Sequence, residues 1–163
     1  MKTPASEFTL MFIKPDAQHW KTVECILDMC AKFGFVIHTS KDAIQLNTAF
    51  IEHFYAEHVG KSFFYEHSIF LQSGFCSAYL LRRRATADIS APEQFRQLVG
   101  NTDPQKATPD TLRRVFGSTL PRNAVHASDS TTAVKREALF FFSGYELCRV
   151  GAEALLDYDH VST

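Results

Sequence analysis

Six consecutive residues near the start of the chain, Phe8 to Ile13, are apolar or β-favouring, and the run stops at Lys14-Pro15-Asp16. A short run of this kind, ended by a proline turn, is typical of a buried β-strand. Polar side chains therefore lie at the end of this strand. Any fold proposed for the chain has to bury this strand and leave Lys14 beside it.

The rest of the chain alternates between helical and strand-like spacing. We expect strands at 35–46 and 75–81. We expect helices at 21–33, from Thr48 through Tyr55, at 62–71, from Pro92 to Val99, and from a cap at Asp129 or Ser130 to about Phe141. Arg82, Arg83 and Arg84 are expected to form a solvated surface loop.

This alternation favours an α+β fold of the ferredoxin-like type, a sandwich in which a four-stranded antiparallel sheet is covered by helices. Periodicity alone leaves a small parallel α/β fold open. With 163 residues, 45% of them hydrophobic, the chain suits one domain over 1–163. We expect its core at about 8–147 and a tail at 148–163 that follows the surface.

The charge balance limits the classes of partner. A net charge of −1 argues against a protein that binds nucleic acid through bulk electrostatics, so no specific nucleic acid is expected. No apolar stretch approaches the roughly 20 residues that cross a bilayer, and the N-terminus lacks a secretory signal. The four cysteines form no CxxC pair. We therefore expect a cytoplasmic protein with reduced thiols and no membrane partner.

The stretch Arg122 to Ser130 places His126 among polar side chains just before an expected helix. It follows a segment, 101–123, that is rich in Thr, Asp, Pro and Gly and is long enough to be functional. Imidazole can act near pH 7 both as a neutral nucleophile and as a leaving group, which suits reversible phosphoryl transfer. The residues also allow a plain structural role for the histidine, in a polar turn.

A nucleophilic imidazole needs a neighbour that fixes its orientation. Ser128 and Asp129 are local candidates, and Glu137 would lie about two turns into the following helix, on a face that can turn back towards His126. The N-terminus of that helix would add a positive dipole end near a transferred phosphate.

The sequence Phe-Ile-Lys14-Pro15-Asp16, followed late in the chain by Asn123-Ala-Val-His126-Ala-Ser128-Asp129, resembles the nucleoside diphosphate kinase family. The match runs from about Phe8 to Phe142. The family motif around its phosphorylated histidine is Asn-x-x-His-Gly-Ser-Asp, and this chain departs from it at Ala127.

The resemblance implies roles at individual positions. His126 would be the nucleophile, with Ser128 and Glu137 orienting it, and Tyr55 would lie near the transferred phosphate. The remaining positions implied to bind nucleotide are Lys14 for the phosphates and ribose hydroxyl, Arg96, Thr102 and Arg113 for the outer phosphates, Phe63 for stacking against the base, Asn123 for the ribose, and His67 and Leu120 at the base site.

The reaction implied is ping-pong. A nucleoside triphosphate would phosphorylate His126 and leave as the diphosphate, and an acceptor diphosphate would then take the group. Mg²⁺ is the implied cofactor, carried by the nucleotide phosphates without a metal site of protein ligands. The positive charges would stabilise the transition state. The implied partners are nucleoside di- and triphosphates and further copies of the chain in a homo-oligomer.

Three departures from the family concern the site. His67 stands where a leucine is usual, which predicts a more polar wall. Leu120 stands where a valine is common. Ala127 replaces glycine, which is tolerable unless that backbone needs a positive φ.

Two other interpretations remain. His53, Glu57 and His58 lack the HExxH spacing of a metal site, and His58 falls off the helical face that His53 and Glu57 share, so we do not expect them to bind metal. The stronger alternative is a catalytically weak, kinase-like domain that binds nucleotide or a protein partner without turnover.

Overall fold

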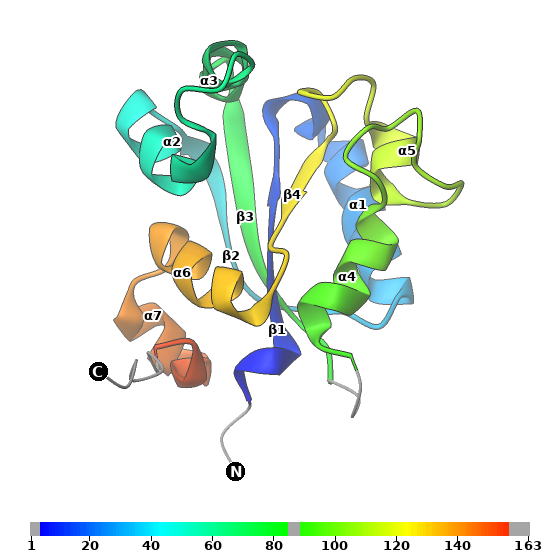
Figure 1. Cartoon of the computed structure of the whole chain (residues 1–163). Coiled ribbons are helices and arrows are strands. Elements are labelled where there is room, and N and C mark those ends of the chain that lie inside the picture. Colours follow the sequence, from blue (N-terminus) through cyan, green and yellow to red (C-terminus); the bar gives the residue numbers. More distant parts are fainter. Residues whose placement is uncertain (1–3, 85–88, 157–163) are drawn as a thin grey trace.

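The computed structural model describes residues 4–84 and 89–156 (Figure 1). A four-stranded antiparallel sheet with the order β2-β3-β1-β4 lies at its centre. The strands are β1 (Phe8–Ile13), β2 (Val36–Gln45), β3 (Phe75–Arg82) and β4 (Val125–Ala127). The expected ferredoxin-like arrangement is confirmed, and the antiparallel pairing rules out the parallel alternative.

β1 is buried along its whole length because it pairs on both sides and is covered on both faces. Successive side chains of a strand point to opposite faces. Phe8, Leu10 and Phe12 therefore enter one hydrophobic core, while Met11 and Ile13 enter the other. This arrangement explains why the sequence of β1 is apolar throughout and does not alternate with polar residues.

Helices cover the two faces of the sheet (Figure 1). One face carries α1 (Trp20–Lys32), α4 (Ala91–Val99) and α5 (Leu112–Phe116); the other carries α2 (Thr48–Phe54), α3 (Phe64–Gln72), α6 (Thr131–Phe141) and α7 (Gly144–Arg149). Short 3₁₀ turns occur at η1 (Ala5–Glu7), η2 (Pro15–Ala17), η3 (Ala56–His58) and η4 (Glu153–Leu155). No helix in the described part of the chain is both long and apolar enough to cross a membrane.

Side-chain caps fix where several helices begin. Ser130, one of the two residues expected to cap this helix, caps α6: its hydroxyl accepts the N–H of Ala133. The expected cap at Thr48 is wrong: Asn47 accepts the N–H of Phe50 at 2.8 Å, and Thr48 is the first residue of α2. The helix also ends at Phe54, so Tyr55 follows it and is not part of it.

The segment expected to follow the surface after residue 147 packs against the core where it is described. Ala152 and Leu155 are buried, and the carbonyl of Val150 is hydrogen-bonded to the His38 side chain of β2. Helix α7, which periodicity did not predict, begins in a capping box made by Ser143 and Glu146. Residues 157–163 of the expected tail lie outside the described residues.

The arginine run begins in the sheet, so the expected surface loop is wrong for Arg82, while Arg84 follows the strand and is exposed as expected. Arg82 is the last residue of β3, and its guanidinium pairs with the Glu7 carboxylate at 2.9 Å. Arg83 lies over the rings of Phe33 and Phe35. Arg82 and Arg83 therefore cover the edge of the core where β3 ends.

Candidate active site

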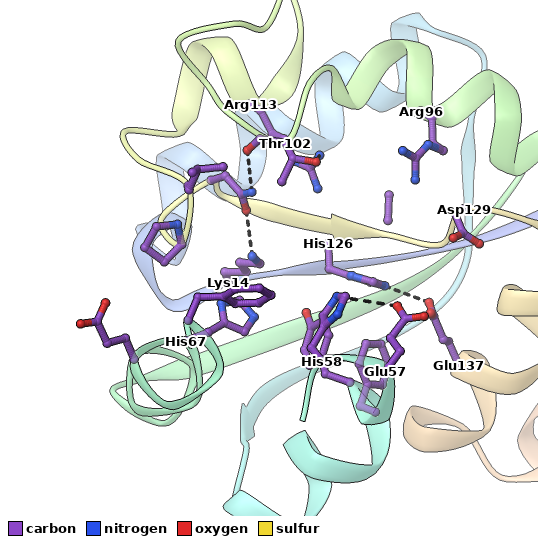
Figure 2. A pocket seen from close by; sticks show the side chains of 18 of the residues that line it. Lys14, Glu57, His58, His67, Arg96, Thr102, Arg113, His126, Asp129 and Glu137 are labelled. Carbon is purple, nitrogen blue, oxygen red and sulfur yellow. Dashed lines mark hydrogen bonds and ion pairs between the residues drawn. The ribbon is translucent and has the colours of Figure 1, made fainter. Parts of the chain in front are cut away.

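A cavity of about 630 Å³ lies between the two helical layers, beside β4 (Figure 2). Its size suits a small-molecule ligand. It gathers nearly all the residues that the sequence singled out, from segments far apart in the chain: Lys14, Tyr55, Phe63, His67, Arg96, Thr102, Arg113, Leu120, Asn123, His126 and Glu137. Ser128 lies behind this wall, 99% buried, and reaches the cavity through Glu137.

His126 is the central residue of β4, a strand too short to predict from periodicity. It pairs in register with Phe12 of β1, so both side chains point to the face covered by α2 and α6. The neighbours Val125 and Ala127 point to the opposite core. Strand alternation thus directs the imidazole towards Glu137 on α6.

Aromatic rings surround the imidazole on its apolar sides. Phe12 stacks against it with centroids 5.0 Å apart, and Phe54 and Tyr55 meet it edge-on at 5.0 and 5.7 Å. The His126 side chain keeps 17% of its surface exposed. The ring is therefore fixed in plane while one side stays open to the cavity.

Glu137 fixes the orientation of the imidazole. Nε2 of His126 lies 2.8 Å from Oε2 of Glu137 (Figure 2). The same oxygen accepts the hydroxyl of Ser128 at 2.7 Å. Burial raises the pKa of Glu137, but hydrogen bonds from His126 and Ser128 and the charge of Arg136 outweigh it and leave that pKa below its usual value. The carboxylate is thus ionised and Nε2 carries the proton. Asp129, the other local candidate, instead accepts the hydroxyl of Ser130 at the cavity wall.

Tyr55 places a buried hydroxyl at the cavity. Its ring is packed among Phe54, His58, His67 and His126, and its oxygen has no hydrogen-bond partner among the described residues. Burial, reinforced by the charge of Glu137, raises the pKa of Tyr55 well above its usual value. The phenol therefore stays protonated and can donate to a ligand.

Lys14 is held at the end of β1 by a chain of hydrogen bonds. Its ammonium donates to Oδ1 of Asn123 at 2.8 Å, and Nδ2 of Asn123 donates to the carbonyl of Thr102 at 2.9 Å. Burial and the neighbouring Arg113 charge lower the pKa of Lys14 to about 7. A nearby anion would restore its charge.

Two arginines extend the positive wall of the cavity. Arg113 of α5 donates to the carbonyls of Gly100 and Val125 and to the hydroxyl of Thr102. Its Nε is buried with no partner among the described residues, and burial with the charge of Arg96 lowers its pKa to about 10. Arg96 reaches the cavity from α4 (Figure 2). The two guanidiniums and Lys14 form a site for an anion of several charges.

The rim of the cavity is more apolar. Phe63 and Leu120 are 50% and 57% exposed there, so their side chains are free to cover a flat ligand. His67 lies below the rim, edge-on to Tyr55 at 5.1 Å. Burial, with the charges of Lys14 and nearby histidines, lowers the pKa of His67 to about 3, so this imidazole is neutral at physiological pH. His58, considered from the sequence only as a metal ligand and not expected to be one, stacks on Tyr55 and meets Phe63 edge-on.

Asp16 supports the site from behind and was expected only as part of a turn. Ala124, just before β4, has a φ of 67°, a conformation that costs a non-glycine residue about 1–3 kcal/mol. Its N–H donates to Oδ2 of Asp16 at 3.0 Å, and its carbonyl accepts the N–H of Lys14 at 2.8 Å. This clip sets the direction in which the chain enters β4 and so presents Asn123 and His126.

We expect Asp16→Ala to destabilise the fold by about 1–3 kcal/mol, because the buried N–H of Ala124 loses its acceptor while the strained backbone remains. Asp16→Asn keeps an acceptor of the same shape and should cost much less. Urea unfolding followed by tryptophan fluorescence measures both. If both variants lose the same free energy of unfolding relative to the wild type, the charge of the carboxylate stabilises the fold and the hydrogen bond to Ala124 does not.

Two expectations about local sequence can be compared with the geometry. Ala127 lies in β4 and is not among the described residues with positive φ, so the condition that would have excluded an alanine there is not met. His53, Glu57 and His58 do not converge on one point: Nε2 of His58 lies 3.7 Å from Oε1 of Glu57, but His53 instead bonds the carbonyl of Ala49. Within residues 4–84 and 89–156, no group of three His, Cys, Asp or Glu side chains is placed to bind a metal.

Together these residues form an oriented nucleophile facing a cluster of cations. Nε2 of His126 is occupied by Glu137, and Nδ1 has no hydrogen-bond partner among the described residues, which leaves it as the nitrogen with an available lone pair. An electrophile bearing negative oxygens would be held by the lysine and arginines close to that nitrogen. The arrangement suits transfer of a phosphoryl group.

Comparisons with known proteins point the same way. The family model described as nucleoside diphosphate kinase matches residues 7–147. The nucleoside diphosphate kinases of Sorangium cellulosum and Wolinella succinogenes are 38% and 40% identical to the chain, over 88% and 86% of it and 95% and 98% of their own lengths.

Solved structures agree with the sequence matches. A halophilic nucleoside diphosphate kinase from Halobacterium salinarum, in complex with CDP, superposes with a TM-score of 0.77 at 31% identity, covering 95% of this chain and 94% of that one. The nucleoside diphosphate kinase of Aquifex aeolicus superposes with a TM-score of 0.76 at 34% identity, covering 86% and 97%.

Proposed function

The chain belongs to the nucleoside diphosphate kinase family and is a phosphotransferase, and we propose that His126 is the residue through which it moves the γ-phosphate of a nucleoside triphosphate to a nucleoside diphosphate. One observation carries the assignment. The imidazole is fixed through Nε2 by a buried carboxylate while Nδ1 has no protein partner among the described residues, and that nitrogen adjoins the lysine and arginine wall.

In the first half-reaction, the Nδ1 lone pair attacks the γ-phosphorus, and the bond from that phosphorus to the β,γ-bridging oxygen breaks. The oxygen keeps the electron pair and leaves with the nucleoside diphosphate. The imidazole keeps its proton on Nε2, and the Glu137 carboxylate balances the positive charge that develops on the ring. In the second half-reaction, a terminal oxygen of the acceptor diphosphate attacks the same phosphorus and Nδ1 leaves.

The surrounding side chains stabilise the phosphoryl oxygens. Lys14, Arg96 and Arg113 supply the positive charge, and the hydroxyl of Tyr55, which has no partner among the described residues, supplies a donor. The buried Nε of Arg113, which has no partner within the described part of the chain, would gain one from a phosphate oxygen. Lys14, Arg113 and Tyr55 are held in place by the contacts described above, so these three groups need little reorganisation when charge moves.

Members of this family need a divalent metal, and we propose that Mg²⁺ enters on the nucleotide phosphates. Mg²⁺ usually keeps several waters and takes one or two protein carboxylates besides phosphate oxygens. The cavity fits this pattern, because Glu57 and Asp129 both line it and would be available to hold the ion, directly or through water. When bound, the ion would neutralise charge on the phosphates.

The nucleoside would lie at the rim. Phe63 and Leu120 offer apolar surface to a base, a contact that tolerates every base because each has a π-face. Asn123 and Lys14, joined by their hydrogen bond, would meet the ribose, and Thr102 with Arg96 the outer phosphates. These roles follow the motif positions and the cavity geometry together.

We also propose a homo-oligomer that works in the cytoplasm as one domain. Support for the oligomer comes from the exposed edge strand β2, where Val36 and Ile37 are 60% and 50% exposed. Support for a reducing compartment comes from the four cysteines, which form no disulfide. Light scattering after gel filtration tests the first point: a monomer at micromolar concentration would contradict it.

The experiment that tests the proposed function is intact-mass analysis under alkaline quench after the protein is mixed with ATP and Mg²⁺. One added phosphoryl group should appear and should disappear when a second nucleoside diphosphate, such as GDP, is added, with formation of GTP. A protein that binds ATP yet gains no phosphoryl group would instead be a nucleotide-binding relative without turnover.

We expect His67→Leu to keep turnover but to narrow the differences in kcat/KM among ATP, GTP, CTP and UTP by up to about tenfold, because a neutral imidazole can bond polar ligand atoms and leucine cannot. The effect of the substitution should be constant from pH 5 to 8, since the pKa of His67 is about 3. Steady-state kinetics with four donors measures it. An unchanged spread would mean that His67 only fills space.

A further inference from the structure

The two oxygens of Glu137 contact different neighbours. Oε2 accepts hydrogen bonds from His126 and Ser128, at 2.8 and 2.7 Å. Oε1 accepts a hydrogen bond from Nη2 of Arg136 at 3.1 Å. The Glu137 side chain is 7% exposed, so each of these contacts acts where water competes little. Arg136 was not among the expected site residues.

Arg136 is itself held in place, although half of its side chain is exposed. Nη1 donates to the carbonyl of Phe54 at 3.2 Å, at the end of α2. The guanidinium also lies over the rings of Phe54 and Phe140, at 5.9 and 6.0 Å from their centroids. An isolated surface ion pair contributes little, but a guanidinium fixed by two hydrogen bonds and two rings has a defined direction.

These contacts join the two sides of the nucleophile. Phe54 packs edge-on against His126, and the next residue, Tyr55, brings to the cavity a hydroxyl that has no partner among the residues described. On the other side, Glu137 orients Nε2 of the same imidazole. One guanidinium therefore ties the end of α2 to the carboxylate on α6, with His126 between them.

We propose that Arg136 is a positioning residue for phosphoryl transfer, acting through Glu137: it fixes the carboxylate so that Oε2 stays on Nε2 of His126 and Nδ1 stays the attacking nitrogen. The inference rests on the proposed function of His126. Without Arg136, Oε1 has no described partner, the carboxylate gains freedom to rotate, and the imidazole gains access to the other tautomer.

The first test is the rate of phosphohistidine formation in single turnovers with ATP and Mg²⁺ at pH 7. Arg136→Met should lower the limiting rate about tenfold or more, while the ATP concentration for half-maximal rate changes by less than about threefold. Arg136→Lys should recover part of the rate, because an ammonium can bond the carboxylate but cannot span both partners. Arg149→Met on α7 removes a guanidinium that lies over Tyr145 and should behave as the wild type.

A double-substitution cycle identifies the route of the effect. If Arg136 acts through Glu137, Arg136→Met should cost nothing further in a Glu137→Gln background. An equal cost in both backgrounds would overturn the proposal. So would a raised half-maximal ATP concentration with an unchanged limiting rate, which would make Arg136 a phosphate-binding residue. Thermal unfolding of each variant checks the fold, and Arg136→Lys carries the test if Arg136→Met unfolds.

A second test does not depend on turnover. Nitrogen-15 NMR of the histidine ring in the protein without nucleotide should show His126 mainly as the Nε2–H tautomer, and a mixture of tautomers in Arg136→Met. The same spectrum for both proteins would overturn the proposal. A wild type that holds the Nε2–H tautomer yet forms no phosphohistidine would remove the proposed function while leaving the positioning contact in place.

Discussion

Replacement of His126 by alanine should abolish the phosphoryl-enzyme and reduce transfer from ATP to GDP by about 10³-fold or more. The reason is geometric. The buried carboxylate of Glu137 fixes the imidazole through Nε2, and no other described nucleophile is oriented in this way beside the cations of the cavity. Alkaline-quench mass analysis and a coupled assay for GTP measure the two losses.

The same substitution should leave nucleotide binding nearly intact. Lys14, Arg96 and Arg113 stay in place, so the dissociation constant for ADP with Mg²⁺ should change by less than about tenfold. His126→Gln is a useful companion because it retains more side-chain volume between Phe12 and Phe54. If alanine at this position leaves substantial transfer with sequential kinetics, the phosphoryl group passes directly between nucleotides and the ping-pong assignment fails.

The position of His126 relative to Glu137 could be predicted from sequence because both lie in one local unit. Glu137 lies eleven positions after His126, in the helix that Ser130 caps. Helical spacing alone then returns Glu137 towards the strand. The end of β1 is equally readable, since an apolar run that stops at Lys14-Pro15 has to leave its lysine at the strand terminus.

Elements without periodicity were harder to predict. β4 has three residues, Val125 to Ala127, too few for an alternating pattern to be recognised, and it is defined by pairing with β1. α7 is a six-residue helix whose apolar face is short, although the Ser143–Glu146 capping box marks its start. Asn47 and Thr48 are both acceptable caps, and only the folded backbone decides between them.

Residues that act through distant contacts were missed for a different reason. Asp16 lies 108 residues from Ala124 in the sequence. Its role depends on the positive φ of Ala124, which the sequence does not indicate because alanine rarely adopts that conformation. Arg136 contacts Phe54, 82 residues away, and His58 enters the cavity because η3 turns it onto Tyr55. In each case a single sequence gives the residue types, but not the contacts between distant residues on which their roles depend.

The second large effect concerns Lys14 and predicts that nucleotide binding takes up a proton. In the free protein, burial and Arg113 lower the pKa of Lys14 from 10.5 to about 7, so above pH 7 this side chain is mostly a neutral amine. The phosphates of a bound nucleotide favour the ammonium and raise that pKa. Above pH 7, the dissociation constant of ADP with Mg²⁺ should therefore rise by up to about tenfold per pH unit.

The sign of the effect follows from the protonation states at each pH. At pH 6, Lys14 is already charged in the free protein, so binding takes up no proton at this residue; at pH 8, binding should take up close to one. Titration calorimetry in buffers of different ionisation enthalpy measures the number directly. Arg113 does not contribute to the measured proton uptake, because its pKa of about 10 keeps it charged between pH 6 and 8.

Lys14→Met separates the proton uptake from other titrations. It removes the amine from the hydrogen bond to Asn123, should lower the rate of His126 phosphorylation by about 10²-fold, and should make nucleotide affinity nearly independent of pH between 7 and 8.5. Uptake that persists in this variant would assign the proton to another group. Uptake that is absent from the wild type would mean that Lys14 is already charged in its buried position, held there by Asp16 and Asn123.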